Sequence, residues 1–257
     1  MGSEMCIRDS NNVGSTLALL RRARQAEIRR FVFSSSCAVY GNPGHVPVDE
    51  SHPCRPTSPY GESKLMVEQM LPWLDNAYGF RAATLRYFNA AGAALDGSHG
   101  ETWQGTTGLL PSILRVAAGV SPALKIYGVD YPTPDGTAVR DYIHVVDLAE
   151  AHVRALDILD LHDRSLLVNL GTGRGHSVAE VVDVARRVTG SPIPVEAVQR
   201  RPGDIAAIWA DTDGAREGLG WQARHDMETI VRSAWQWYLR SQGHQAPATV
   251  GHGQLSS

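Results

Sequence analysis

Two short apolar segments flank one long helical pattern, and this arrangement restricts the fold more than any other feature of the chain. The first segment, residues 30–35, ends in serines, and the second covers residues 81–87. Between them, Ser58 is suited to cap a helix, Pro59 to begin it and Gly79 to end it. A strand, a helix and a strand in this order predict a βαβ unit, whose two strands lie parallel in one sheet.

The alternation of helices and strands continues along the chain. We expect helices at residues 11–27, 109–118, 146–159, 177–189, 212–218 and 226–240, and strands at residues 124–127 and 166–170. After Asn89 the pattern loosens into a loop rich in Gly and Thr, where a second, smaller lobe begins. Pro72 should kink or break the long helix that precedes the second strand. The predicted fold class is therefore α/β.

Composition and charge exclude several classes of protein. The net charge of −3 gives no basic excess for binding nucleic acid or an acidic membrane surface, so we expect a small-molecule partner. The sequence contains neither an apolar run of about 18 residues nor the apolar core of a signal peptide, which predicts a cytoplasmic protein. Its three cysteines form no CxxC pair and its ten histidines no HExxH motif, so no metal site is predicted.

Tyr60 and Lys64 form the strongest chemical motif in the sequence. They are four residues apart on the first turns of the predicted helix, so their side chains share one face, and Ser36 precedes them at the end of the first strand. A phenol with a pKa of about 10 is a poor base, but a nearby ammonium group favours the phenolate and lowers that pKa. Tyr60 is then suited to take a proton from a substrate hydroxyl that Ser36 also hydrogen-bonds. The alternative is an ordinary Tyr–Lys contact on an exposed helix.

Six segments, in this order along the chain, resemble the UDP-glucose 4-epimerases of the extended short-chain dehydrogenase/reductase family: FVFSSSCAVYG, SPYGESKLMVEQ, RYFNAAGA, YPTPDGTAVRDYIHVVDLAEAHV, NLGTGRGHSV and RRPGDIAAIWAD. The resemblance extends from Asn11 to about Tyr238. It implies NAD as the cofactor and a UDP-sugar as the substrate. The implied reaction oxidises C4 of the sugar to a ketone, turns the sugar over and reduces it again.

The resemblance also implies a role for individual residues of this sequence. It assigns catalysis to Ser36, Tyr60 and Lys64, and contacts with NAD to the same three residues together with Asn11, Tyr87 and Phe88. It assigns contacts with the UDP-sugar to Ser36, Asn89, Lys125, Ile126, Tyr127, Arg140, Arg201 and Asp204. Arginine side chains suit a diphosphate and an acidic side chain suits a ribose diol, so these assignments agree with elementary chemistry.

The fold that the resemblance implies is a partial Rossmann-like doubly wound parallel sheet that lacks its N-terminal strands, with a smaller α/β lobe for the substrate. We expect residues 1–10 to be a foreign or artefactual leader and residues 11–90 the C-terminal part of the NAD-binding domain. Residues 91–240 should be mainly the UDP-sugar lobe, with some returning Rossmann elements, and residues 241–257 a disordered tail. The chain is thus expected to be N-terminally truncated. The resemblance implies a homodimer through the helix that bears Tyr60 and the helix from about Asn12.

Several finer points follow from particular positions. Cys37 and Ala38 stand where related dehydratases carry an acidic residue, which favours an epimerase, and we expect Cys37 to be a packed side chain rather than a nucleophile. The glycines of residues 171–175 lack the GxGxxG spacing of a dinucleotide motif. Because such a motif is missing, a chain that binds nucleotide sugar without catalysis stays open. So does a 4-epimerase of UDP-N-acetylglucosamine, a UDP-pentose or UDP-glucuronate. Gly108 and Ile208 stand where the family often has an asparagine and a residue bordering the sugar pocket, which leaves the choice between glucose and N-acetylglucosamine open.

Overall fold

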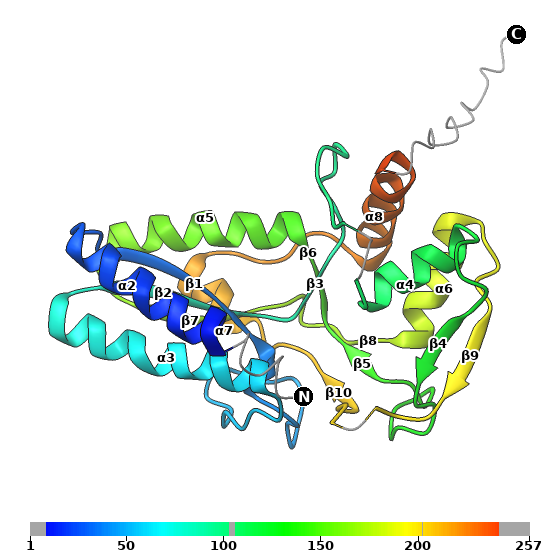
Figure 1. The fold of residues 1–257 in the computed structure, drawn as a ribbon, viewed down its shortest axis with the longest axis horizontal. Coiled ribbons are helices and arrows are strands. Elements are labelled where there is room, and N and C mark those ends of the chain that lie inside the picture. The colour runs from blue at the N-terminus through cyan, green and yellow to red at the C-terminus, as the bar shows by residue number, and fades with distance from the viewer. Residues whose placement is uncertain (1–8, 103–105, 202, 242–257) are drawn as a thin grey trace, which may run out of the picture.

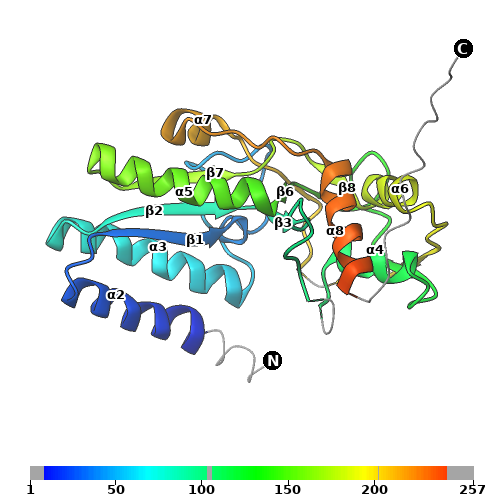
Figure 2. The same ribbon diagram turned by 90° about the horizontal axis from the view of Figure 1, so that it is seen from above.

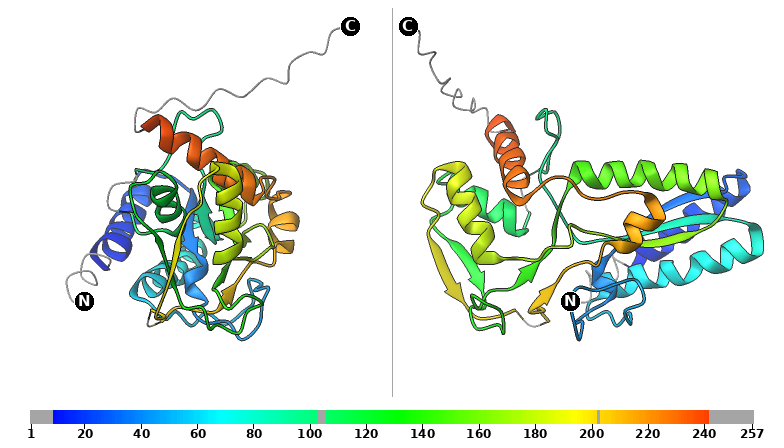
Figure 3. Two further views of the ribbon diagram at one scale, coloured as in Figure 1. Left: turned by 90° about the vertical axis from the view of Figure 1, so that its right-hand side faces the viewer. Right: turned by 180° about the vertical axis from the view of Figure 1, so that it is seen from behind.

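The protein has two lobes that are joined by short strands (Figure 1). A computed structural model describes residues 9–102, 106–201 and 203–241. The larger lobe, called the sheet lobe, contains the parallel sheet and the helices on its two faces. The smaller lobe, called the distal lobe, contains three helices and a two-stranded sheet, and Figure 3 shows the two lobes side by side from behind.

The sheet lobe is built on three parallel strands in the order β1-β2-β7: β1 (Arg30–Ser36), β2 (Arg81–Tyr87) and β7 (Leu166–Leu170). Their carboxyl ends are level, because Ser36 is in register with Tyr87 and Tyr87 with Leu170. Helices α2 (Ser15–Gln25) and α3 (Pro59–Tyr78) cover one face, and α5 (Val145–His162) and α7 (Asp213–Leu219) cover the other (Figure 2). A π-helix, η1 (Asp9–Gly14), precedes α2. The predicted βαβ unit is confirmed, and so is the α/β class.

Helix α3 begins and ends as the sequence predicts. The Ser58 hydroxyl accepts a hydrogen bond from the backbone N–H of Gly61 at 3.1 Å, and Gly79 ends the helix in the left-handed conformation at φ 63°. The expectation that Pro72 breaks the helix is wrong, because α3 is one continuous helix from Pro59 to Tyr78. Pro72 removes one main-chain hydrogen bond, the one to the carbonyl of Glu68, and the helix continues through it.

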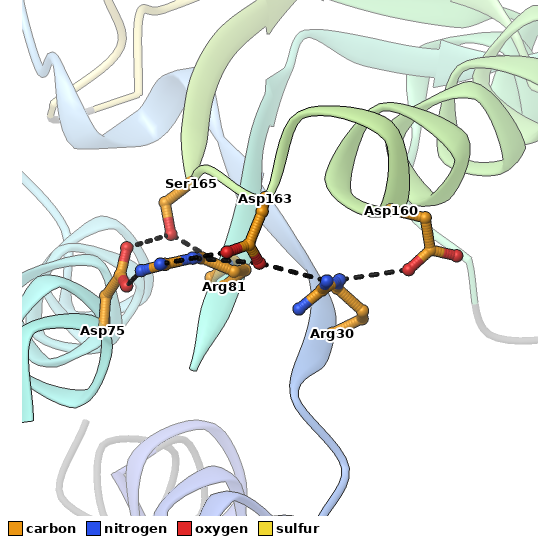
Figure 4. A network of polar contacts seen from close by, with 7 residues as sticks. Arg30, Asp75, Arg81, Asp160, Asp163 and Ser165 are labelled. Atoms are coloured by element: carbon orange, nitrogen blue, oxygen red, sulfur yellow. Dashed lines mark hydrogen bonds and ion pairs between the residues drawn. The ribbon is translucent and has the colours of Figure 1, made fainter. Parts of the chain in front are cut away.

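A network of charged side chains ties the helices to the amino ends of the strands (Figure 4). Arg81, at the start of β2, pairs with Asp75 of α3 and with Asp163 beyond the end of α5. Arg30, at the start of β1, pairs with Asp160 at 3.0 Å and with Asp163 at 3.1 Å. Most of these side chains are partly exposed, so each pair adds little to stability and the network mainly fixes position.

The distal lobe packs three helices against a small parallel sheet. Strands β4 (Leu124–Tyr127) and β9 (Val195–Val198) pair, and α4 (Leu109–Ala117), α6 (Val178–Thr189) and α8 (Met227–Ser241) enclose a core that includes Ile113, Val181 and Ile230. Strand β4 and the helices agree with the sequence prediction to within a few residues. Strand β9 was not predicted.

Very short strands connect the two lobes. Strand β3 (Asn89–Ala91) pairs with β6 (Tyr142–His144), and β5 (Val139–Arg140) lies between β8 (His176–Ser177) and β10 (Ala207–Ile208). Strands β3, β5, β8 and β10 were not predicted. The predicted leader mostly precedes the described residues, and the predicted tail, residues 241–257, lies outside them except for Ser241. In the described ranges, no helix has the length and hydropathy needed to cross a membrane.

Candidate active site

Three consecutive serines end strand β1, and each has a different hydrogen-bond partner. Ser34 contacts Nε2 of His152 on α5 at 3.0 Å, and the Ser35 hydroxyl donates to Glu68 on α3 at 2.5 Å. Ser36 points past the end of the strand, where its hydroxyl accepts a hydrogen bond from the backbone N–H of Ala38 and caps the 3-10 turn η2 (Cys37–Val39). The strand is therefore anchored on both faces, and Ser36 is held at the carboxyl edge of the sheet.

Helix α3 brings Tyr60 and Lys64 to the same edge. The Lys64 ammonium donates to the backbone carbonyl of Ser34 at 2.9 Å and lies 5.7 Å from the centroid of the Tyr60 ring. The two side chains share one face of the helix, as their spacing predicts. Burial among neighbouring groups lowers the pKa of Lys64.

Gly61 allows α3 to approach the 3-10 turn this closely. A Cβ atom at this position would lie 2.4 Å from the backbone oxygen of Ala38, which is far inside van der Waals contact. The backbone of α3 therefore touches the backbone of η2 directly. This contact sets the separation between Tyr60 on the helix and Ser36 at the start of the turn.

A cavity of about 440 Å³ lies between the lobes, next to the carboxyl edge of the sheet. The sheet lobe contributes Ser36, Cys37 and Phe88 to its wall, and the connecting strands contribute Asn89 of β3, Arg140 of β5 and Ile208 of β10, with Asp204 just before β10. Five predicted site residues thus share one cavity: Ser36, Phe88, Asn89, Arg140 and Asp204. A cavity of this size, with polar groups converging from the sheet lobe and the connecting strands, is typical of a small-molecule site.

The predicted residues of β4 form a separate group with Arg201. The Arg201 guanidinium lies 3.6 Å from the centroid of the Tyr127 ring, and its hydrogen bond to the phenol, together with its charge, lowers the pKa of Tyr127. Lys125 is exposed, while the Ile126 side chain is buried in the core of the distal lobe. Only the backbone of Ile126 is therefore open to a ligand. None of these four residues belongs to the wall of the cavity.

Two predicted residues can be placed only in part. Tyr87 ends β2 beside Ser36 in the register of the sheet and is half-buried. Asn11 belongs to η1 by its backbone, but its side chain lies outside the described part of the structure. The neighbouring Asn12 donates from Nδ2 to the Ser63 hydroxyl at 3.0 Å, which ties η1 to α3.

Cys37 lies in the wall of the cavity and is held as a neutral thiol. Burial raises its pKa to about 12, and the nearby Arg140 charge only partly offsets that effect. A thiol with so high a pKa is a poor nucleophile at neutral pH. This agrees with the expectation that Cys37 is a packed side chain.

The glycine-rich turn after β7 is filled by a carboxylate of the chain itself. The backbone N–H groups of Thr172 and Gly173 donate to the buried side chain of Asp141 at distances between 2.9 and 3.1 Å. A Cβ atom at Gly171 would lie 2.4 Å from Oδ2 of Asp141. The backbone N–H groups of the turn already donate to Asp141, so they are not available to the phosphates of a dinucleotide.

Part of the cavity wall was missed by the sequence analysis. Gly41, Thr57 and Ser58 belong to it, although the sequence analysis assigns none of them to a site. The available signal was its position, since the loop follows the carboxyl end of a parallel strand, where sites of α/β proteins lie. In the described ranges, no group of three or more His, Cys, Asp or Glu side chains is placed to bind a metal ion.

Comparison with known proteins identifies the family. The model of the NAD dependent epimerase/dehydratase family matches residues 7–171. The chain belongs to this family. Among its relatives, the UDP-glucose 4-epimerase of Lacticaseibacillus casei is 48% identical over 89% of this chain and 69% of its own length. The UDP-glucose 4-epimerase of Rhizobium leguminosarum bv. trifolii is 47% identical over 91% of this chain and 72% of its own length.

Solved structures of family members share the fold. A UDP-glucose-4-epimerase from Stenotrophomonas maltophila, with bound NAD and formylated UDP-arabinopyranose, has a TM-score of 0.90 at 44% identity. That match covers 94% of this chain and 74% of the other. A UDP-glucose 4-epimerase from Bifidobacterium longum, in complex with NAD+ and UDP, has a TM-score of 0.85 at 42% identity and covers 91% and 70% of the two chains.

Proposed function

We propose that the protein interconverts UDP-glucose and UDP-galactose as an NAD-dependent 4-epimerase. The observation that carries this proposal is the cavity at the carboxyl edge of the sheet, whose wall includes Ser36, Asn89, Arg140 and Asp204. Tyr60 and Lys64 are not in this wall, but they reach the same edge of the sheet, where Lys64 donates to the Ser34 carbonyl. The named relatives at 47% to 48% identity support the same activity.

The side chains at the strand ends fit the nicotinamide end of NAD. The Lys64 ammonium can donate to a ribose diol and the Tyr60 phenolate oxygen can accept from it, and Tyr87 and Phe88 provide aromatic surface for the nicotinamide ring. Lys64 is already directed at the strand end, because it donates to the Ser34 carbonyl. The chemistry that bound NAD supplies is reversible hydride transfer at C4 of the sugar.

In this proposal, Tyr60 acts as the base and the acid of the reaction. Its phenolate takes the proton of the sugar O4 hydroxyl and later returns it, while Ser36 hydrogen-bonds the same oxygen. The Lys64 ammonium, on the same helix face, favours the phenolate form. Between oxidation and reduction, the 4-keto sugar rotates inside the cavity, so that its opposite face is turned toward the nicotinamide.

The nucleotide part of the substrate is assigned to residues on the distal side. Arg140 and Arg201 are suited to the diphosphate, and Asp204 to the ribose diol. The backbone of β4 and the ring of Tyr127 are suited to the uracil base. Because Arg201 stacks on Tyr127 in the structure, these two side chains must rearrange if both are to contact the nucleotide.

The experiment that tests the function compares two identical substitutions on one helix. Tyr60→Phe should abolish the conversion of UDP-galactose to UDP-glucose, measured by a coupled dehydrogenase assay on protein supplied with NAD. Tyr78→Phe is the matched control, because Tyr78 is on α3 and is 53% exposed at the far end. Parental activity in Tyr60→Phe would refute the mechanism, and a parent protein that is inactive on UDP-sugars would refute the function.

We further propose that the protein is a cytoplasmic homodimer that associates through the outer faces of α2 and α3. These faces carry large exposed apolar side chains on residues that include Leu19, Met66 and Trp73, at 56%, 43% and 76% exposure. Exposed apolar surface of this kind is typical of an interface between subunits. The cytoplasm is where NAD and nucleotide sugars are available to such an enzyme.

A further inference from the structure

The face of α3 that carries Tyr60 and Lys64 continues with a third chemically active side chain, Glu68. The three residues are spaced four apart, so they lie in one row along the helix. The Glu68 side chain is only 5% exposed, and it forms an ion pair with Arg86 of β2, whose side chain is 6% exposed. Neither residue has a role in the proposed chemistry.

The ion pair is closely bonded and buried. Arg86 Nε lies 3.0 and 3.1 Å from the two carboxylate oxygens of Glu68, and Arg86 Nη2 lies 2.6 Å from Oε2. Burying two charges is costly unless both are fully hydrogen-bonded, so a pair of this kind is weak support for stability alone. Its geometry, in contrast, fixes the position of the helix relative to the strand with high precision.

Glu68 also reaches the strand that carries Ser36. The hydroxyl of Ser35, which is fully buried, donates to Glu68 Oε1 at 2.5 Å. Ser35 directly precedes Ser36, and Arg86 directly precedes Tyr87. The Glu68 carboxylate is therefore bonded to both Ser35 and Arg86. Each of these residues directly precedes a proposed site residue: Ser36, which would bond the sugar oxygen, and Tyr87, which would contact the nicotinamide ring.

Arg86 extends the same network to the wall of the cavity. Its Nη1 donates to the Tyr40 hydroxyl at 3.1 Å and to the Glu50 carbonyl at 3.3 Å. The Tyr40 hydroxyl in turn donates to Asn169 Oδ1 on β7 at 2.6 Å. The loop that contributes Gly41 to the cavity is thus tied to β2 and β7 through Arg86.

We propose that Glu68 is a positioning residue, which holds Tyr60 and Lys64 of α3 in register with Ser36 through Ser35 and with β2 through Arg86. This proposal rests on the 4-epimerase function proposed above. It explains why a charged pair is buried at the carboxyl end of the sheet. At this end, a displacement of the catalytic side chains by about 1 Å can lower the rate of the reaction roughly 100-fold.

The structure offers a matched control in a second ion pair between the same two elements. Asp75 of α3 pairs with Arg81 of β2 at the opposite end of the sheet, away from Tyr60 and Lys64 (Figure 4). A general requirement for joining α3 to β2 would make both pairs equally important. A positioning role predicts that only the pair at the carboxyl end affects catalysis.

The test compares Glu68→Gln with Asp75→Asn on protein supplied with NAD and UDP-galactose. Glu68→Gln keeps the shape of the side chain but removes its charge, so we expect kcat to fall about 10-fold or more. KM for UDP-galactose should stay within about twofold, because Arg140 and Asp204 lie on the other side of the cavity. Asp75→Asn should keep both parental values.

A second variant keeps the test decisive if Glu68→Gln does not fold, as judged by circular dichroism and urea unfolding. Ser35→Ala removes one hydrogen bond to Glu68 and leaves the ion pair intact, and it should lower kcat about threefold or more at unchanged KM. Parental kcat in a folded Glu68→Gln variant, or equal losses in it and Asp75→Asn, would overturn the positioning role. An inactive parent would instead refute the 4-epimerase function, so the two failures are distinguishable.

Discussion

The stability of the protein should decrease when the solution is acidified, because His144 is buried as a neutral ring. His144 is fully buried at the end of β6, where its Nδ1 accepts from the backbone N–H of Val146 at 3.1 Å. Its Nε2 lies 3.0 Å from the hydroxyl of Ser233 on α8. These contacts place the ring proton on Nε2, so a second proton on Nδ1 would point at an N–H group.

The magnitude follows from the difference in pKa between the folded and unfolded chains. Burial, together with the neighbouring His225, lowers the pKa of His144 from 6.5 to about 4. Below pH 6.5 the unfolded chain therefore binds a proton that the folded protein rejects, and stability is lost progressively down to about pH 4. Between pH 7.5 and pH 5 this difference amounts to about 2 kcal/mol.

The assay is urea unfolding of the parent and of His144→Asn at both pH values. Asparagine keeps an oxygen that can accept from Val146 but does not titrate, so the loss of stability on acidification should be about 2 kcal/mol smaller in the variant. Ser233→Ala is the control, because it removes the hydrogen bond and leaves the ring titratable. Equal loss of stability on acidification in the parent and His144→Asn would refute the reasoning.

Three further predictions concern packing and assembly. Gly61→Ala should lower kcat and cost about 1–3 kcal/mol in urea unfolding, because the new Cβ would lie 2.4 Å from the Ala38 oxygen; parental values would contradict the close approach of α3 to η2. Leu85→Ala, in the centre of the sheet at 0% exposure, should cost about 3 kcal/mol in the same assay, while Leu156→Ala on α5 at 45% exposure should cost less than about 0.5 kcal/mol. Trp73→Glu should convert the proposed dimer into a monomer in light scattering, and an unchanged mass would exclude this face as the interface.

The sequence predicts those parts of the fold whose signals are local. Ser58, Pro59 and Gly79 specify the two ends of α3 through capping and turn chemistry, and the structure uses each of them as predicted. The position of Tyr60 and Lys64 on one helix face follows from their spacing alone. Pro72 shows the limit of such local signals: it does not break α3, because one missing main-chain hydrogen bond need not end a helix that is bonded on both sides of it.

Features that depend on distant residues were not accessible from the sequence. Strands β5, β8 and β10 have two residues each, which is too short for any periodicity, and they exist because segments far apart in the chain pair in space. Glu68 and Arg86 each look like an ordinary surface charge on an amphipathic element, and only the folded chain brings them together in the interior. The same holds for Asp141, whose partners lie some thirty residues further along the chain.

The one-sided pairing of β1 has a consequence for the exchange of amide hydrogens with solvent. Among the strands that the structure describes, β1 pairs with β2 alone, whereas β2 is enclosed between β1 and β7. In a parallel strand, alternate backbone N–H groups point to opposite sides, so half of those in β1 point away from β2. In deuterated water, amide hydrogens on the outer edge of β1 should exchange first, and those of β2 should persist until the whole sheet opens.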